Sequence, residues 1–115
     1  MIYKKLNKQF SVSDQIDVDD IDELVAHGVQ IIICNRPDNE EPNQPLFESI
    51  KKAAEAQSIE THLLDFSSYH IKDKHRDQLV PFINSNKKIH LYCRTGSRST
   101  RLWRSVIHLS MNKPE

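Results

Sequence analysis

The residues whose types and spacing suit chemistry stand together near the end of the sequence, in the segment YCRTGSRS at residues 92–99. Cys93 offers a nucleophilic sulfur, and the planar guanidinium of Arg98 can hold an oxyanion through two parallel hydrogen bonds. The residues expected to bind the anion are Arg94, Thr95, Gly96, Ser97, Arg98 and Ser99. The pattern predicts an anion-binding loop in which Cys93 and Arg98 are catalytic.

The loop is expected to follow a strand and to lead into a helix. Consecutive backbone N–H groups and the N-terminus of the helix then point at one spot, which favours a bound anion and a thiolate. Gly96 is expected to supply a backbone conformation that a side chain disfavours. Ser99 can donate a hydrogen bond to the sulfur of Cys93 when that sulfur acts as a leaving group.

The second cysteine receives a different interpretation. A lone cysteine at the end of a strand is usually a small buried hydrophobic residue. We apply that interpretation to Cys34, which ends the apolar segment VQIIIC at 29–34. Cys93 differs because glycine, arginine and serine follow it at the spacing that an anion-binding loop needs.

Apolar periodicity predicts the elements that must position the loop. Strands are predicted at 9–13, 29–34, 59–64 and 88–92. Helices are predicted from the acidic cluster at 17–20 to Gly28, from Pro45 through Ala54, at 73–84 with a kink or a split at Pro81, and at 98–110 with Leu102, Val106 and Leu109 inward. The alternation predicts one α/β domain over residues 1–115, with a mostly parallel sheet flanked by helices. In such sheets ligands bind beyond the carboxyl ends of the strands, where Cys93 stands.

Composition excludes several functional classes. The 115 residues include 16 basic and 16 acidic side chains, so the net charge of zero offers no broad electrostatic surface to nucleic acid or to an anionic membrane. No apolar run approaches the roughly 20 residues of a membrane span, and the first residues lack the apolar stretch of a secretory signal. Two cysteines are too few for a disulfide framework, so we expect a cytoplasmic protein without nucleic-acid or membrane partners.

Other polar residues receive mainly structural interpretations. His62, His70 and His75 lack ligand spacing on a shared face, so no metal and no cofactor are expected. His90 lies on the strand that delivers Cys93 and is expected to pack rather than to catalyse. Arg36 and Asp38 end a neighbouring strand, where they either brace the loop or form a plain turn.

The loop and its setting resemble the cysteine-dependent phosphatase superfamily, whose signature is His-Cys, five residues, Arg, then Ser or Thr. The segment NRPD at 35–38 with the acids up to Glu41, the strand ETHLLDF at 60–66 and the cysteine strand resemble dual-specificity phosphatases. More closely, residues 8–110 are similar to the phosphatase-like domain of bacterial beta-lactamase-hydrolase-like proteins and their single-domain relatives. The resemblance implies a cysteine-phosphatase-like fold and hydrolysis through a phospho-cysteine at Cys93, with a small anionic substrate or a phosphorylated protein. Related phosphatases usually continue beyond the last helix, so a truncated C-terminus stays an open alternative. The oligomeric state also stays open.

The sequence departs from that signature at two points. Tyr92 stands where the signature has histidine, and four residues, not five, separate Cys93 from Arg98. Four is the spacing of rhodaneses, and some relatives are described as sulfur transferases, so sulfur transfer through a Cys93 persulfide is the first alternative. A shorter loop removes one N–H group and suits a persulfide sulfur better than a phosphoryl group. An anion-binding module without catalysis is the second alternative.

The resemblance also implies a general acid on the loop after the preceding strand, to protonate the leaving alkoxide. Asp65 is the nearest acidic residue and is our catalytic candidate. The register that we favour places Ser68 at that position, and Asp73 and His70 remain alternatives.

Overall fold

One five-stranded sheet, in the order β1-β2-β5-β3-β4, forms the centre of the molecule. The computed structural model describes residues 1–67 and 70–111, so the prediction on Ser68 lies outside the described residues. The elements are β1 (Lys4–Lys5), β2 (Phe10–Ser13), the 3-10 helix η1 (Val18–Asp20), α1 (Ile21–Ala26), β3 (Ile31–Cys34), α2 (Phe47–Glu55), β4 (Glu60–Leu63), α3 (Asp73–Ile83), β5 (Ile89–Tyr92) and α4 (Ser97–Met111). Within the described residues, no helix is long and apolar enough to cross a membrane.

The sheet is mostly parallel, as the alternation of elements predicted. Strands β2, β5, β3 and β4 run parallel, and only β1 pairs antiparallel, with β2. The last residues of three strands share one register, because Tyr92 pairs with Ser13 on one side and with Cys34 on the other. The segments that follow β2, β3 and β5 therefore leave the sheet at a common edge.

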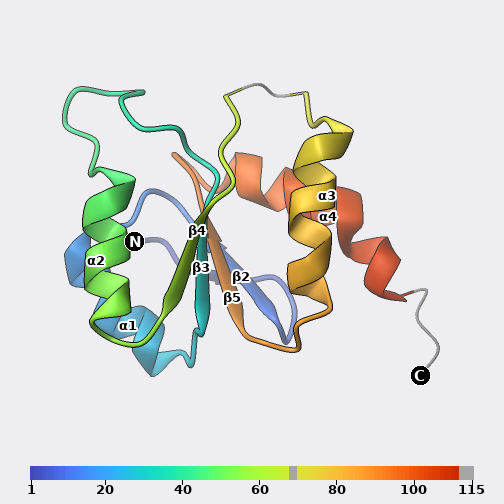
Figure 1. Ribbon diagram of the computed structural model, residues 1–115, viewed down its shortest axis with the longest axis horizontal. Helices are drawn as coiled ribbons and strands as arrows, with labels where there is room; N and C mark the ends of the chain where they lie inside the picture. The colour runs from blue at the N-terminus through green and yellow to red at the C-terminus, as the bar shows by residue number, and fades with distance from the viewer. Residues whose placement is uncertain (68–69, 112–115) are drawn as a thin grey trace.

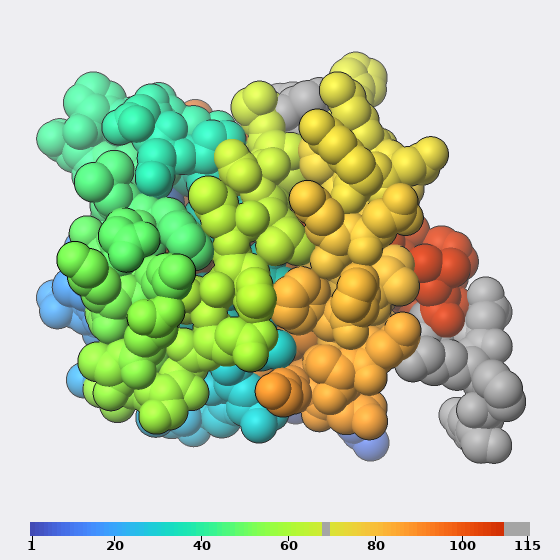
Figure 2. Space-filling model, viewed as in Figure 1, coloured from blue at the N-terminus to red at the C-terminus, as the bar shows by residue number. Residues whose placement is uncertain are grey.

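Helices cover both faces of the sheet (Figure 1), with α1 and α2 on one face and α3 and α4 on the other. Every residue of β3 is buried, because the strand is covered on both faces. Ile31 and Ile33 belong to the apolar cluster on the α3 and α4 side, whereas Ile32 and Cys34 belong to the cluster on the α1 and α2 side. Figure 2 shows the edge of this arrangement, where β4 lies between α2 and α3.

Three local expectations about the helices differ from the structure. Helix α2 begins at Phe47 rather than at Pro45, and the Phe47 N–H donates to Asp38 Oδ1 at 2.9 Å. Helix α3 continues through Pro81 to Ile83 as one helix, so it is not split at this proline. Leu109 is 42% exposed, which makes the inward prediction wrong, because the end of α4 extends past the sheet and α3 (Figure 1).

His90 packs inside the fold, as predicted, and links β5 to β2. Its ring is fully buried, with Nδ1 2.8 Å from Ser11 Oγ and Nε2 2.8 Å from Ser13 Oγ. The Ser13 hydroxyl donates its proton to the Asp14 carbonyl, so its oxygen must accept from Nε2–H. Nδ1 therefore accepts from the Ser11 hydroxyl, and the imidazole is neutral with its proton on Nε2.

We expect His90 to make the protein less stable as the pH falls below about 6.5. Burial, helped by the nearby charge of His27, lowers the pKa of His90 to about 3. The unfolded state therefore binds the extra proton first, so stability is present above pH 6.5 and is lost towards pH 3. Between pH 7 and pH 5 the loss due to this group is about 2 kcal/mol.

Urea unfolding of the wild type and of His90→Gln at both pH values checks this prediction. The variant should lose about 2 kcal/mol less between pH 7 and pH 5. His75, whose pKa is also lowered by burial and by neighbouring lysines and Arg76, contributes equally to both proteins. An identical pH-dependent loss in both proteins contradicts the role of His90.

Candidate active site

Cys93 directly follows β5, at the carboxyl edge of the sheet, between β2 and β3. Its side chain is 1% exposed, and its Sγ accepts a hydrogen bond from the Gly96 N–H at 3.1 Å. The loop is held on both sides by the backbone, since Gln15 N–H donates to the Arg94 carbonyl and Asn35 N–H donates to the Tyr92 carbonyl. The sulfur thus lies at the floor of a closed turn.

Gly96 is required by the shape of the turn. Its φ is +95°, a conformation that residues with a side chain rarely adopt. A Cβ at this position would also lie 3.4 Å from the Ser13 carbonyl oxygen. The loop is therefore pressed against the end of β2, and the expectation of a special backbone angle at Gly96 is confirmed.

Helix α4 begins at Ser97, so Arg98 lies in its first turn. The first N–H groups of a helix have no partner within the helix, and they carry the positive end of its dipole. The Ser97 N–H donates to Thr95 Oγ1 at 3.4 Å, so this first donor of the helix already has a partner. The positive end of the α4 dipole and the Gly96 N–H, which donates to Sγ, direct positive potential at the Cys93 sulfur.

The guanidinium of Arg98 is held by two acceptors. Its Nη1 donates to Glu40 Oε2 and to the Phe66 carbonyl, each at 3.0 Å, and its Nη2 donates to Glu40 Oε1 at 3.1 Å. These contacts use three of the five N–H groups of arginine. The two N–H groups left, on Nε and Nη2, lie along one edge of the guanidinium, which is the edge that can bind a second oxyanion in bidentate fashion.

Glu40 is an ionised carboxylate shared by two arginines. It accepts from Arg36 Nε at 2.9 Å as well as from Arg98, and its side chain is 22% exposed. Burial by itself raises the pKa of Glu40, but hydrogen bonds from Arg98 and Arg36 outweigh burial and hold the pKa below its ordinary value. A group that stays ionised cannot donate a proton, so Glu40 orients Arg98 and is not a general acid.

Glu41 extends the same network to Arg94, the first residue of the loop after Cys93. Its Oε1 lies 2.7 Å from Arg36 Nη2 and 2.9 Å from Arg94 Nε. Arg36 is buried and also donates to Gln15 at 3.0 Å, so it braces the loop through Glu40 and Glu41. Three arginines and two glutamates leave one net positive charge in this network.

Several sequence-based expectations around the loop need correction. The Ser99 hydroxyl donates to Asn35 Oδ1 at 2.8 Å, so its proton is directed at that amide and not at the Cys93 sulfur. Asn35 Nδ2 in turn donates to the Leu64 carbonyl, which fixes the orientation of the amide. Of the two turn residues Arg36 and Asp38, only Arg36 braces the loop, since Asp38 caps α2. Sequence reasoning did not assign Glu40 and Glu41 to the loop, although two adjacent acids after β3 were a signal.

Cys34 and Tyr92 belong to the apolar cluster beside α1 and α2. Burial is the main cause that raises the pKa of Cys34 to about 11, against lowering by hydrogen bonds to Tyr92 and to the Arg36 carbonyl. Burial, followed by the neighbouring Cys34, raises the pKa of Tyr92. The interpretation of Cys34 as a buried, unreactive thiol agrees with this environment.

The acid candidates lie after β4, on the α3 side of the loop. Asp65 is exposed and lines a pocket of about 420 Å³ with Lys72, Lys74 and His75. The next residue in the chain, Phe66, provides the carbonyl that accepts from Arg98, so Asp65 adjoins a residue that contacts the loop. Asp73 is instead paired with Arg76 Nη2 at 2.5 Å, on the first turn of α3. Asp65 is therefore a better candidate for the general acid than Asp73, whose carboxylate is paired. The third candidate, His70, is exposed.

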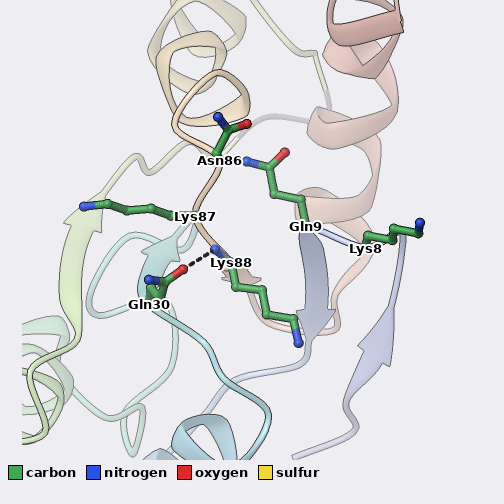
Figure 3. Close-up of a pocket in the computed structure, with 6 residues that line it drawn as sticks. All are labelled: Lys8, Gln9, Gln30, Asn86, Lys87 and Lys88. Atoms are coloured by element: carbon green, nitrogen blue, oxygen red, sulfur yellow. Dashed lines mark hydrogen bonds between the residues drawn. The ribbon is translucent and has the colours of Figure 1, made fainter. Parts of the chain in front are cut away.

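A pocket at the opposite edge of the sheet is unrelated to this site. It measures about 410 Å³ and is lined by Lys8, Gln9, Gln30, Asn86, Lys87 and Lys88, which precede β2, β3 and β5. Figure 3 shows that the ammonium groups of Lys8, Lys87 and Lys88 point in different directions and do not converge on one ligand. The pocket lies at the amino ends of the strands, whereas Cys93 lies at their carboxyl ends.

Comparisons with known proteins identify the family and the fold of this chain. The family model described as "Beta-lactamase hydrolase-like protein, phosphatase-like domain" matches residues 3–109. A candidate phosphatase from Neisseria meningitidis has a similar structure, with a TM-score of 0.82 and 29% identity over 96% of this chain and 79% of that one. A comparison with curated proteins finds no match.

Two more distant structures share the fold alone. A candidate phosphatase from Shewanella putrefaciens has a TM-score of 0.82 and 12% identity, over 98% of this chain and 71% of that one. The core catalytic domain of the PP-IP phosphatase SIW14 from S. cerevisiae, in complex with citrate, has a TM-score of 0.64 and 13% identity, over 98% of this chain and 78% of that one. The fold is thus that of cysteine phosphatases, as predicted.

Proposed function

This chain belongs to the family of the phosphatase-like domain of beta-lactamase hydrolase-like proteins, and we propose that it hydrolyses phosphate esters through a phospho-cysteine at Cys93. The observation that carries the proposal is the closed loop, in which the Cys93 sulfur accepts the Gly96 N–H while Arg98 keeps one bidentate edge for an oxyanion. The substrate is a small anionic molecule or a phosphorylated protein.

The reaction proceeds in two balanced steps. The Cys93 thiolate attacks phosphorus, the bond to the ester oxygen breaks, and the leaving oxygen takes a proton from Asp65. Water then attacks the phospho-cysteine, gives a proton to the Asp65 carboxylate, and releases inorganic phosphate and the thiolate. The N–H groups of residues 94–99 and the free edge of Arg98 stabilise the phosphoryl oxygens in both transition states.

Asp65→Asn tests the assignment of the acid. We expect turnover of an alkyl phosphate to fall about a hundredfold, because an alkoxide leaves slowly without a proton donor. An activated aryl phosphate should be affected far less, since its phenolate leaves unaided. Steady-state rates on both esters, with Asp77→Asn on the outer face of α3 as a control, give the comparison. Equal losses on both esters remove Asp65 from this role.

Sulfur transfer is the second candidate, because only four residues separate Cys93 from Arg98 and the turn closes directly over the sulfur. In this reaction the Cys93 thiolate attacks the sulfane sulfur of a thiosulfate-like donor, and sulfite leaves. The resulting persulfide passes its outer sulfur to an acceptor such as cyanide, which becomes thiocyanate and restores the thiolate.

Three measurements on the purified protein separate these candidates. We expect phosphate release from an aryl phosphate, and protection of Cys93 from iodoacetamide by vanadate or phosphate. Thiocyanate formation from thiosulfate and cyanide without phosphate release would replace the phosphatase by a sulfurtransferase. Protection of Cys93 with neither activity would leave an anion-binding module, and no protection together with no activity would overturn the loop as an anion site.

A further inference from the structure

A second pocket adjoins the loop on its β2 side, opposite the Glu40 and Glu41 network that follows β3. It measures about 390 Å³ and shares Thr95, Gly96 and Ser97 with the loop that holds Cys93. The end of β2 forms another wall through Ser13, whose carbonyl oxygen would lie 3.4 Å from a Cβ placed at Gly96. An anion bound over Cys93 and a group in this pocket would therefore be close neighbours.

The pocket is strongly cationic. Lys4 from β1 and Arg101 and Arg104 from α4 line it, and among the described residues no carboxylate does. On the β3 side of the loop, Glu40 and Glu41 add two negative charges next to the arginines. In a chain with a net charge of zero, such a local excess of positive charge favours an anionic ligand.

Helical spacing places these cations at a defined reach from the reacting phosphate. One face of α4 carries Ser97, Arg101 and Arg104, because the two arginines follow Ser97 by four and by seven residues. At a rise of 1.5 Å per residue, Arg101 and Arg104 stand about 6 and 10 Å along the axis from the first residue of the helix. Two phosphates on one small ring or short chain span a comparable distance.

The other cationic pockets lack one of these properties. The pocket beside Asp65 also adjoins the loop region, but that carboxylate offsets Lys72 and Lys74. The pocket at the amino ends of the strands has three lysines that diverge, and it is remote from Cys93 (Figure 3). Among the pockets described above, only the one on the β2 side both adjoins the anion-binding residues and has basic but no acidic residues in its lining.

We propose that this pocket binds a second phosphoryl group of the substrate, held by Lys4 and Arg104 while the first phosphoryl group lies over Cys93. The inference rests on the proposed phosphatase function and narrows its substrate class to small molecules that carry at least two phosphates. The second phosphate is bound and is not transferred.

Binding to the Cys93→Ser protein tests the proposal without turnover. The probes are phenyl phosphate and hydroquinone bisphosphate, which differ by one phosphate across the same ring. We expect calorimetry to show about tenfold tighter binding of the bisphosphate, the effect of one charge-assisted contact. Adding Lys4→Gln and Arg104→Gln should remove that preference. Adding Lys72→Gln and Arg76→Gln, an equal charge change on the α3 side, should leave it.

Equal affinity for the two probes, or a preference that survives Lys4→Gln and Arg104→Gln, overturns the second phosphate site. Turnover of both esters by the protein with Cys93 intact is measured in parallel. Hydrolysis without any preference refutes the second site and leaves the phosphatase. A preference that depends on Lys4 and Arg104, in a protein that hydrolyses neither ester, supports the second site and refutes the phosphatase.

Discussion

Cys93→Ser is expected to lower phosphate-ester turnover by about 10⁵-fold or more, because a serine hydroxyl in the same loop is a poor nucleophile without an adjacent base. The change replaces Sγ by a smaller Oγ in a fully buried position, and the Gly96 N–H can still donate to it. The fold should persist, and the protein should still bind phosphate or vanadate. Rates on an aryl phosphate, together with the thermal midpoint and anion titrations, check these expectations.

Cys34→Ala is the matched control for this change. It removes the other buried thiol, which belongs to the apolar cluster beside α1 and α2. Burial raises the pKa of this thiol to about 11. Turnover should stay near the wild-type value. If Cys93→Ser retains substantial turnover while Cys34→Ala loses it, the assignment of the nucleophile is wrong.

The second large effect is expected at Arg98. Arg98→Lys keeps the positive charge but has no planar fork, and the three donors of its ammonium are too few to hold Glu40 in bidentate fashion, the Phe66 carbonyl and both oxygens of an oxyanion. We expect kcat/KM on an aryl phosphate to fall by roughly 10²- to 10³-fold, the usual cost of losing a transition-state donor. Most of the loss should be in kcat, and inhibition by vanadate should weaken.

Arg76→Lys provides the comparison for the same substitution elsewhere. Arg76 pairs with Asp73 on α3 through a contact that a lysine can also make, and it lies outside the loop. The activity of the Arg76→Lys variant should match that of the wild type. Retention of near wild-type kcat/KM by Arg98→Lys would show that the guanidinium fork is not used.

Most of the fold could be predicted because its elements follow local patterns. The run at 31–34 is wholly apolar, which is what a strand covered on both faces requires, and the structure buries every residue of it. β1 was not predicted, because Lys4 and Lys5 carry no apolar pattern and join the sheet through their backbone. The start of α2 was missed because its first N–H is capped from Asp38, nine residues earlier.

The sequence by itself determined which residues form the loop and where the loop lies. Cys93, Gly96 and Arg98 are close in the chain, and the topology of a parallel sheet brings the end of a strand to the ligand-binding edge. The tertiary structure alone decided the partners of each charged group. Glu40 is 58 residues from Arg98, and Asn35 is 64 residues from Ser99. Such pairs depend on how separate strands lie side by side, and no local pattern of residues encodes that arrangement.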